Sequence, residues 1–478
     1  MPSIRSILRG LTLACALSAL LTASPLVTPA SAQIATIGTV EPASFSLDAA
    51  AVRVATTQTF SSSSETSSFI TVHFSSFHLA SGDKVVVRSP DYASQYEYTG
   101  LGRGELGQSG GFFSSRIVGN TAIVEFVPSP DAKPTSGQGF SINNISRASR
   151  GANTLTTCGT DDTQPAKCYE TDGPLYKKSQ AVARLLIDGQ TSCTGWLIGS
   201  EGHLMSNYHC LGEKNNALIT DYELSAESGS CDDQCKVKSG CPGTIVATTA
   251  ELIASDVDLD YALVKLNSTV DLAAFGYMQL RVAGATTNET IYIPQHPSGY
   301  AKRIAVTVDD GSLATVQGVD ASSACGNHRV LYTADTQGGS SGSPVIARKD
   351  NAVVALHSCG VLTEPCVNSG TDIRGVIFDL KSKGVLPQNA VDDPAAPIPK
   401  GPWIPGVTAA PTPAPTPVPT QSVCRIFIYE PSCLNTIPGR CMWVDGKCVA
   451  NTGAATPTAT PAPTPAPTPE PTPAPTPE

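Results

Sequence analysis

The positions of the 15 cysteines constrain the fold of this 478-residue chain more than any other feature. Cys15 lies inside an N-terminal apolar run, ten cysteines fall between residues 155 and 394, and the last four fall between residues 424 and 448. Removal of Cys15 with a leader segment would leave an even number, 14. Even cysteine counts in an oxidising compartment indicate disulfide frameworks. We therefore expect a large and a small disulfide-bonded module.

Residues 1–32 have the pattern of a secretory signal peptide. Arg5 and Arg9 precede an apolar run from Leu11 to Leu21, and a small-residue segment ends in Ala30-Ser31-Ala32. The run is shorter than the roughly 20 residues that span a bilayer. We expect cleavage after Ala32 and a secreted, extracellular protein that does not enter a membrane. The excess of 41 acidic over 31 basic residues also argues against nucleic acid as a partner.

Residues 33–150 contain no cysteine and alternate apolar with polar residues, as in the segment 69–74. This alternation, with Gly/Ser/Asp turns, predicts a β-sandwich. The Gly82-Asp83 turn and the closing Gly139-Phe140-Ser141-Ile142 resemble CUB-like jelly-roll modules, although CUB domains usually carry disulfides. Two roles remain open for this domain: a pro-segment that is removed after folding, or a retained binding module.

Residues 151–394 contain many short apolar strands separated by turn residues, which predicts an all-β barrel or sandwich. Composition then changes, because 22 of the 38 prolines lie in the last 88 residues. We expect extended Pro/Thr-rich segments at 395–423 and 450–478. Between them, residues 424–449 form a small four-cysteine module that two disulfides would hold. Tyr429 and Trp443 would suit binding to a cell-wall polysaccharide, or they could be the module's core.

The strongest chemical signal is Gly338-Gly339-Ser340-Ser341-Gly342-Ser343-Pro344-Val345. Glycines beside a serine let a substrate backbone approach and free main-chain amides for a developing oxyanion. A serine nucleophile also needs a histidine base and a buried carboxylate that orients it. His209 follows a strand-like segment, and a disulfide between Cys193 and Cys210 would fix its loop. Asp260 immediately precedes an apolar strand, and Asp256 and Asp258 are the alternative acids.

The order of His209, Asp260 and Ser341 and their local sequences resemble the chymotrypsin-like serine proteases of the trypsin superfamily. A closer resemblance is to secreted lysyl endopeptidases, on Gly339 to Pro344, His296 to Ile304 and Leu356-His357. The resemblance implies a double β-barrel at 151–394, without metal or cofactor. It also implies that Ser341 attacks the scissile bond, His209 acts as base, Asp260 orients it, and the Gly339 and Ser341 amides bind the oxyanion.

A pocket acid beside Ser341 would select a cationic substrate side chain. Asp335 lies six residues before Ser341, where trypsin-like enzymes carry such an acid, and Asp372 resembles the pocket acid of lysyl endopeptidases. Either points to cleavage after Lys or Arg, unless it is a solvated turn acid; Arg374 could neutralise Asp372. The resemblance also places His357 among the substrate-binding residues.

Ser340 stands where digestive trypsin-like enzymes carry an acid that captures the freed N-terminus, so we do not expect that activation switch. Arg147 and Arg150 are candidate sites for processing of a zymogen. Two further disulfides are implied by the resemblance: Cys158 with the segment containing Cys359 and Cys366, and Cys168 with Cys231, Cys235 or Cys241. Three sequons predict N-glycosylation in a eukaryotic host, at Asn144, Asn267 and Asn288.

The sequence thus predicts a secreted, monomeric serine endopeptidase that acts on protein or peptide substrates. The alternative is a catalytically inactive protease homologue that serves as a binding or inhibitory protein.

Overall fold

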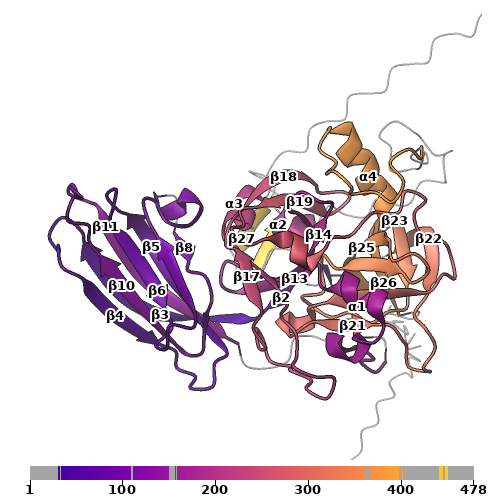
Figure 1. Cartoon of the computed structure of the whole chain (residues 1–478), viewed down its shortest axis with the longest axis horizontal. Helices are drawn as coiled ribbons and strands as arrows, with labels where there is room; N and C mark the ends of the chain where they lie inside the picture. Colours follow the sequence, from indigo (N-terminus) through magenta and orange to yellow (C-terminus); the bar gives the residue numbers. More distant parts are fainter. Residues whose placement is uncertain are drawn as a thin grey trace, which may run out of the picture.

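The computed structural model describes residues 31–397, 401 and 441–450, except 33, 109–110, 150–156, 158, 324, 362–365 and 445–446. Two bodies are apparent in Figure 1: an N-terminal β-sandwich in indigo and purple, and a larger all-β unit to its right. The all-β class predicted from the sequence is confirmed. Among the described helices, none has the length and apolar character needed to cross a membrane.

The sandwich consists of two antiparallel sheets around an aromatic core. Strand β10 alternates buried and half-buried residues, as the period-two pattern predicted, because one face of the sheet packs inward. Phe74, Phe77 and Phe112 contact one another in the core with ring centroids 5.2 to 5.6 Å apart. The first sheet has the order β4 (Thr56–Ser61), β10 (Thr121–Val127), β6 (Lys84–Arg88), β7 (Gln95–Tyr98); the second has β3 (Gly38–Asp48), β11 (Gly139–Ala148), β5 (Phe69–His78), β8 (Phe112–Phe113), with β9 (Ile117–Val118) also paired to β5.

The larger unit contains two antiparallel sheets that form the double β-barrel expected for residues 151–394. The first sheet has the order β17 (Thr244–Ala247), β16 (Thr220–Leu224), β13 (Val182–Ile187), β14 (Thr191–Ile198), β15 (His203–Ser206), β19 (Tyr261–Leu266), β18 (Ala250–Asp256). The second has the order β12 (Gln164–Pro165), β21 (Arg303–Ala305), β20 (Ile291–Gln295), β24 (Pro344–Ala347), β25 (Val353–Val361), β26 (Val367–Asp372), β23 (Gly326–Tyr332), β22 (Val316–Ser323).

Helices are short, and all but η1, which belongs to the sandwich, lie in the larger unit. They are α1 (Gly173–Ser179), α2 (Tyr208–Leu211), α3 (Lys214–Leu218) and α4 (Ile373–Ser382), with 3-10 turns η1 (Arg103–Gln108), η2 (Ala166–Tyr169), η3 (Leu272–Phe275) and η4 (Pro297–Gly299). Of the C-terminal module, the structure describes a hairpin of β27 (Cys441–Val444) and β28 (Lys447–Ala450). Cys424 and Cys433 and most of both Pro/Thr-rich segments lie outside the described residues.

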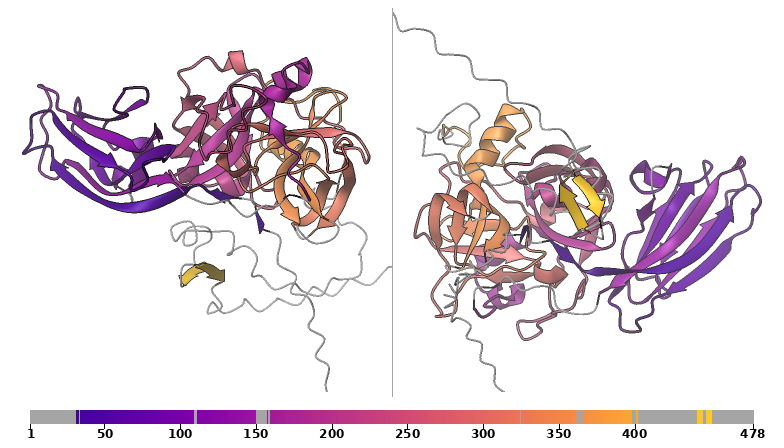
Figure 2. Two further views of the ribbon diagram at one scale, coloured as in Figure 1. Left: turned by 90° about the horizontal axis from the view of Figure 1, so that it is seen from below. Right: turned by 180° about the vertical axis from the view of Figure 1, so that it is seen from behind.

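Buried ion pairs join the sandwich to the first barrel, at the contact between the two bodies that Figure 2 shows from two further directions. Arg103 lies 2.7 Å from Asp221, and Arg116 lies 2.5 Å from Glu223. Burial alone would raise the pKa of Glu223, but the charges of Arg184 and Arg116 hold it below its ordinary value. Removing one partner would leave a buried charge uncompensated, which costs several kcal/mol, typically about 3 to 5. The contact is therefore a specific interface.

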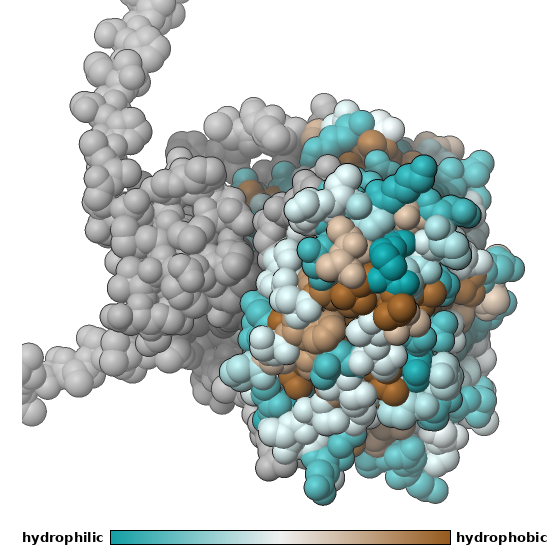
Figure 3. Space-filling model, turned by 90° about the vertical axis from the view of Figure 1, so that its left-hand side faces the viewer, coloured by the Kyte–Doolittle hydropathy of each residue, from teal (hydrophilic) through white to brown (hydrophobic). Residues whose placement is uncertain are grey.

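The outer face of the sandwich, which Figure 3 shows, mixes polar with apolar residues. Elsewhere among the described residues, Val54 and Tyr92 are the most exposed large apolar side chains, and the Arg88 guanidinium lies over the Tyr92 ring at 4.0 Å from its centroid.

The N-terminal segment before the sandwich reaches both barrels. Strand β1 (Ser31–Ala32) pairs with β25, and β2 (Ala35–Thr36) pairs with β14. Figure 1 shows β2 between the sandwich and the barrels. Cleavage after Ala32, as expected for a signal peptide, would thus separate β1 from β2.

Candidate active site

His209 and Asp260 are brought together by the pairing of β15 with β19. Ser206, at the end of β15, lies opposite Ala262, near the start of β19, so the residues that flank these strands meet at one edge of the sheet. The Nδ1 atom of His209 lies 3.0 and 2.9 Å from the two carboxylate oxygens of Asp260. The main-chain amide of His209 also donates to Asp260, at 3.1 Å. This carboxylate therefore fixes both the ring and the backbone of the histidine.

The backbone of Asp260 is held in a conformation that non-glycine residues rarely adopt, with φ of 50°. The Asn207 side-chain amide donates to the Asp260 carbonyl at 2.8 Å and helps to hold it. Asp256 instead accepts the amides of Asp258 and Leu259, so it closes the turn before β19. Of the three acids considered from the sequence, the structure pairs Asp260 with His209.

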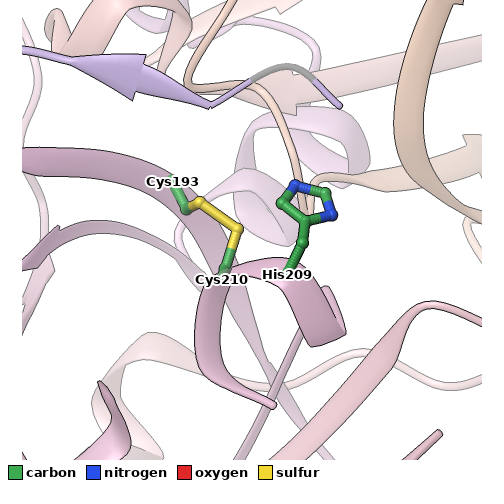
Figure 4. Close-up of side chains that lie close together, drawn as sticks. All are labelled: Cys193, His209 and Cys210. Carbon is green, nitrogen blue, oxygen red and sulfur yellow. A yellow bond between two sulfur atoms is a disulfide. The ribbon is translucent and has the colours of Figure 1, made fainter. Parts of the chain in front are cut away.

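The predicted disulfide between Cys193 and Cys210 is present and ties α2 to β14. Figure 4 shows it beside the ring of His209. The two sulfurs and a His209 nitrogen lie close enough together to resemble a metal site. Because both sulfurs are bonded to each other, neither is available as a thiolate ligand. The disulfide therefore positions the helix that carries the histidine.

Ser341 lies on the loop that enters β24. Its side chain is fully buried, and among the described residues neither its Oγ atom nor the Nε2 atom of His209 has a hydrogen-bond partner. Gly342, with φ of 88°, packs so closely against the Thr194 carbonyl and the Ser206 hydroxyl that a Cβ atom would collide with both. The loop of residues 338–343, which we call the nucleophile loop after the role expected of Ser341, thus requires glycine at 342 and lies directly against the strand end that leads to His209.

Thr194 holds the same loop in a conformation that leaves two amides unused. Its amide donates to the Ser341 carbonyl at 2.8 Å, and its hydroxyl donates to the Gly339 carbonyl at 2.9 Å. Within the described part of the chain, the Gly339 and Ser341 amides donate no hydrogen bond. Two fixed, unused donors beside a serine can stabilise a negatively charged oxygen.

The segment around His296 supports the loop from the other side. The Ser298 amide donates to the Gly338 carbonyl at 2.6 Å, and the His296 amide donates to the Thr194 hydroxyl at 3.1 Å. In the sequence this segment served only as a mark of resemblance. Its supporting role depends on contacts between distant residues, which its own composition does not reveal.

Arg329 is a further residue that sequence reasoning missed. Its buried guanidinium donates to the Thr371 hydroxyl at 2.8 Å and to the Ser358 hydroxyl at 2.6 Å. Thr371 in turn donates to the Leu259 carbonyl, directly before Asp260. Burial lowers the pKa of Arg329, and the Asp260 carboxylate opposes that shift. Arg329 therefore supports the acid both through the backbone and by its charge.

The two acids predicted for the substrate pocket have different surroundings. Asp335 is buried, and its carboxylate accepts the Asp162 amide at 2.9 Å. Asp372 caps the start of α4 and forms an ion pair with Arg374 at 2.5 Å. The structure therefore shows the alternative considered from the sequence, in which Arg374 neutralises Asp372. Asp372 does not supply an uncompensated charge.

His357 is fully buried, and the Tyr332 hydroxyl lies 2.6 Å from its Nδ1 atom. The Gly342 amide donates to the His357 carbonyl at 2.9 Å, which places this residue against the nucleophile loop. Burial, together with the charges of His209 and Arg329, lowers the pKa of His357 to about 3. Its ring is therefore neutral over most of the pH range.

Two of the three residues expected to bear on activation, Ser340 and Arg147, lie in the described part of the chain. The Ser340 hydroxyl donates to the Gln295 side-chain carbonyl, so this position is occupied by an internal polar contact. Arg147 lies within β11 and is paired with Glu41, so a protease would have to open the strand to reach it. Arg150 lies outside the described residues.

Other disulfides agree with the sequence expectations in part. Cys168 pairs with Cys231, one of its three expected partners, while Cys235 pairs with Cys241. Cys359 pairs with Cys325, a bridge that the sequence did not predict. Cys366 is disulfide-bonded and Cys158 lies outside the described residues. Of the sequons, Asn267 and Asn288 are exposed, whereas Asn144 is half-buried in β11.

The low pKa of His357 predicts a pH dependence of stability. As the pH falls from about 6.5, an unfolded histidine binds a proton that the folded protein cannot accept until near pH 3, so stability is lost on acidification. We expect His357→Gln to reduce the slope of unfolding free energy against pH by about 1.4 kcal/mol per pH unit between pH 6 and 4. Urea unfolding at several pH values measures this slope, and parallel curves for both proteins would contradict the assignment.

Residues 193–356 of the chain match the family model described as a trypsin-like peptidase domain. Secreted RxLR effector protein 73 from Plasmopara viticola is 40% identical over 335 residues, which cover 67% of this chain and 81% of that protein. A glutamyl endopeptidase from Bacillus licheniformis is 26% identical over 209 residues, covering 39% of this chain and 58% of that protein. The chain thus spans less than two thirds of the length of that endopeptidase.

Among solved structures, a Glu endopeptidase in complex with MPD is 18% identical, with 48% of this chain and 99% of that chain covered and a TM-score of 0.33. The HtrA-type protease AlgW with a tripeptide is 15% identical, with 44% and 62% covered and a TM-score of 0.32. By its identity to the effector protein and its coverage of it, the chain belongs to that protein's family, and it carries a trypsin-like peptidase domain of the serine protease type.

Proposed function

We propose that the protein is an active, secreted serine endopeptidase whose catalytic residues are Ser341, His209 and Asp260. The observation that carries this proposal is the bidentate contact of Asp260 with Nδ1 of His209, while Nε2 of the same ring has no hydrogen-bond partner among the described residues. A neutral imidazole oriented in this way can accept the proton of a serine hydroxyl.

In the first step Ser341 Oγ attacks the scissile carbonyl carbon while His209 Nε2 takes the hydroxyl proton. The same proton passes to the leaving amine, and an acyl-enzyme remains. Water then attacks the ester, with His209 again as the base, and releases Ser341. The Gly339 and Ser341 amides stabilise the oxyanion at each stage, since both are fixed and unused.

For specificity, we propose cleavage after Lys or Arg, with Asp335 as the pocket acid. Asp335 is a buried carboxylate on the segment that leads into the nucleophile loop, six residues before Ser341. A second candidate is cleavage after Glu. It is favoured by the similarity to a glutamyl endopeptidase and by the neutral His357 beside the loop.

The rival function is a catalytically silent homologue that acts by binding. The name of the effector protein records secretion and an effector role, which supports an extracellular location for this chain as well.

We also propose that the sandwich remains attached to the barrels, because its release would break the ion pairs of Arg103 and Arg116 and leave their charged partners uncompensated.

Loss of the nucleophile or the base tests the activity. We expect Ser341→Ala and His209→Ala each to lower kcat for peptide hydrolysis by on the order of a million-fold. A fluorophosphonate probe should label the wild-type chain at Ser341 and leave Ser341→Ala unlabelled. Absence of labelling in every processed form of the wild-type chain would favour the silent homologue.

Arg329 tests the support of Asp260. We expect Arg329→Met to lower kcat about tenfold with little change in KM, because its guanidinium bonds to Ser358 and Thr371 and its charge acts on the Asp260 carboxylate. Arg329→Lys should recover part of the loss. The control is Arg281→Met, which removes a buried arginine paired with Glu289 and should affect stability alone. A rise in KM with kcat unchanged would contradict the positioning role.

Chromogenic peptides that end in Lys, Arg or Glu test the specificity. With Asp335 as the pocket acid, wild-type protein should prefer Lys or Arg, and Asp335→Ser should lower kcat/KM for these by about 100-fold or more, since an ion pair in a desolvated pocket is lost. Asp372→Ser is the matched control and should leave the preference unchanged. A preference for Glu in the wild-type protein would establish the second candidate.

A further inference from the structure

The N-terminal segment of the chain adds a short strand to each barrel on the two sides of the nucleophile loop. In β1, Ser31 pairs with Gly360 and Ala32 with Cys359, both in β25. In β2, Ala35 pairs with Ser192 and Thr36 with Thr191, both in β14. We call β1 and β2, with Ile34, the N-terminal strap. The strap therefore bridges two strand edges that belong to different barrels.

Both of these edges lead directly to the nucleophile. In β25, the His357 carbonyl accepts the amide of Gly342, next to Ser341. In β14, the Thr194 amide donates to the Ser341 carbonyl. The carbonyl of Ile34 lies 3.4 Å from where a Cβ on Gly338 would stand. The described parts of the strap thus lie on strand ends to either side of the loop that carries Ser341.

The strap is held in place from the sandwich side. Ala35 and Ile37 are buried in one apolar cluster with Phe69 and Leu186. The amides of Ile37 and Gly38 donate to the Gln190 carbonyl at 2.8 and 2.9 Å. Phe69 belongs to the sandwich and Leu186 to the first barrel. The packing of the two bodies therefore fixes the point from which the strap enters the cleft.

We propose that the N-terminal strap is a tethered, substrate-like occupant of the cleft that keeps the peptidase latent. Extended peptides commonly bind by adding a strand to an unpaired strand edge, and the strap pairs with the ends of β14 and β25 that extend beyond their pairing with β15 and β24. The full burial of Ser341 is consistent with an occupied cleft. The proposal concerns regulation of the same site and rests on the proposed peptidase activity.

Tethering makes even weak binding effective. A short linker gives a local concentration on the order of millimolar. A segment that binds with a Kd of about 0.1 mM would then occupy the cleft about 90% of the time and lower kcat/KM roughly tenfold. Signal cleavage after Ala32 would remove β1 and leave β2 in place, so the secreted chain would still be partly closed.

The test compares three proteins: the chain that starts at residue 25 and contains the whole strap, the chain that starts at residue 33, and the chain that starts at residue 37. We expect kcat/KM for a chromogenic peptide to rise along this series, by about tenfold or more in total. A synthetic peptide of residues 31–38 should inhibit the shortest chain competitively. If that chain does not fold, Ala35→Pro/Thr36→Pro in the chain from residue 33 makes the same comparison, because it removes the amides that can pair with β14.

The control is Thr36→Ala in the chain that starts at residue 33, which changes an exposed side chain and keeps the strap backbone. It should behave as its parent. Equal hydrolysis and equal labelling by the fluorophosphonate probe in all chains would overturn the strap proposal and leave the peptidase intact. Failure of every chain to react with the probe would instead overturn the proposed activity.

Discussion

The two hydrogen bonds from Thr194 to the nucleophile loop are the constraint on which the rest of the site depends. They connect β14, in the first barrel, with the loop that enters β24, in the second. The first barrel also carries His209, which follows β15, and Asp260, which precedes β19. Thr194 bonds only to carbonyls of the loop, and the amides of Gly339 and Ser341 donate no hydrogen bond within the described part of the chain. One contact between barrels thus sets both the position of Ser341 and the oxyanion donors.

Support for the acid and the base comes from three separate directions. The disulfide from Cys193 fixes the helix of His209, Asn207 holds the strained backbone of Asp260, and Arg329 reaches that backbone through Thr371. Each contact joins residues far apart in sequence. Buried charges such as Arg329 are costly unless they are hydrogen-bonded and close to an opposite charge. The interaction of the Arg329 charge with the Asp260 carboxylate offsets part of the cost of burying that charge.

The sandwich and the N-terminal strap are structurally coupled. The ion pairs of Arg103 and Arg116 hold the sandwich against the first barrel, and the cluster of Ala35, Ile37, Phe69 and Leu186 lies where the chain leaves the sandwich for the cleft. A domain with no catalytic residue of its own can therefore influence access to Ser341, because its attachment determines where the preceding segment runs.

Local sequence alone was sufficient to predict the all-β class and the bridge between Cys193 and Cys210, whereas the double barrel was implied by the resemblance to the trypsin superfamily. The first two depend on short-range alternation, composition or a motif. The sequence also singled out Ser341, His209 and Asp260, and the structure brings the latter two into contact. It could not decide that Asp372 pairs with Arg374, that Cys325 pairs with Cys359, or that Arg329 and the N-terminal strap lie at the site. Those outcomes depend on which distant strands become neighbours, and only the closed barrels determine that.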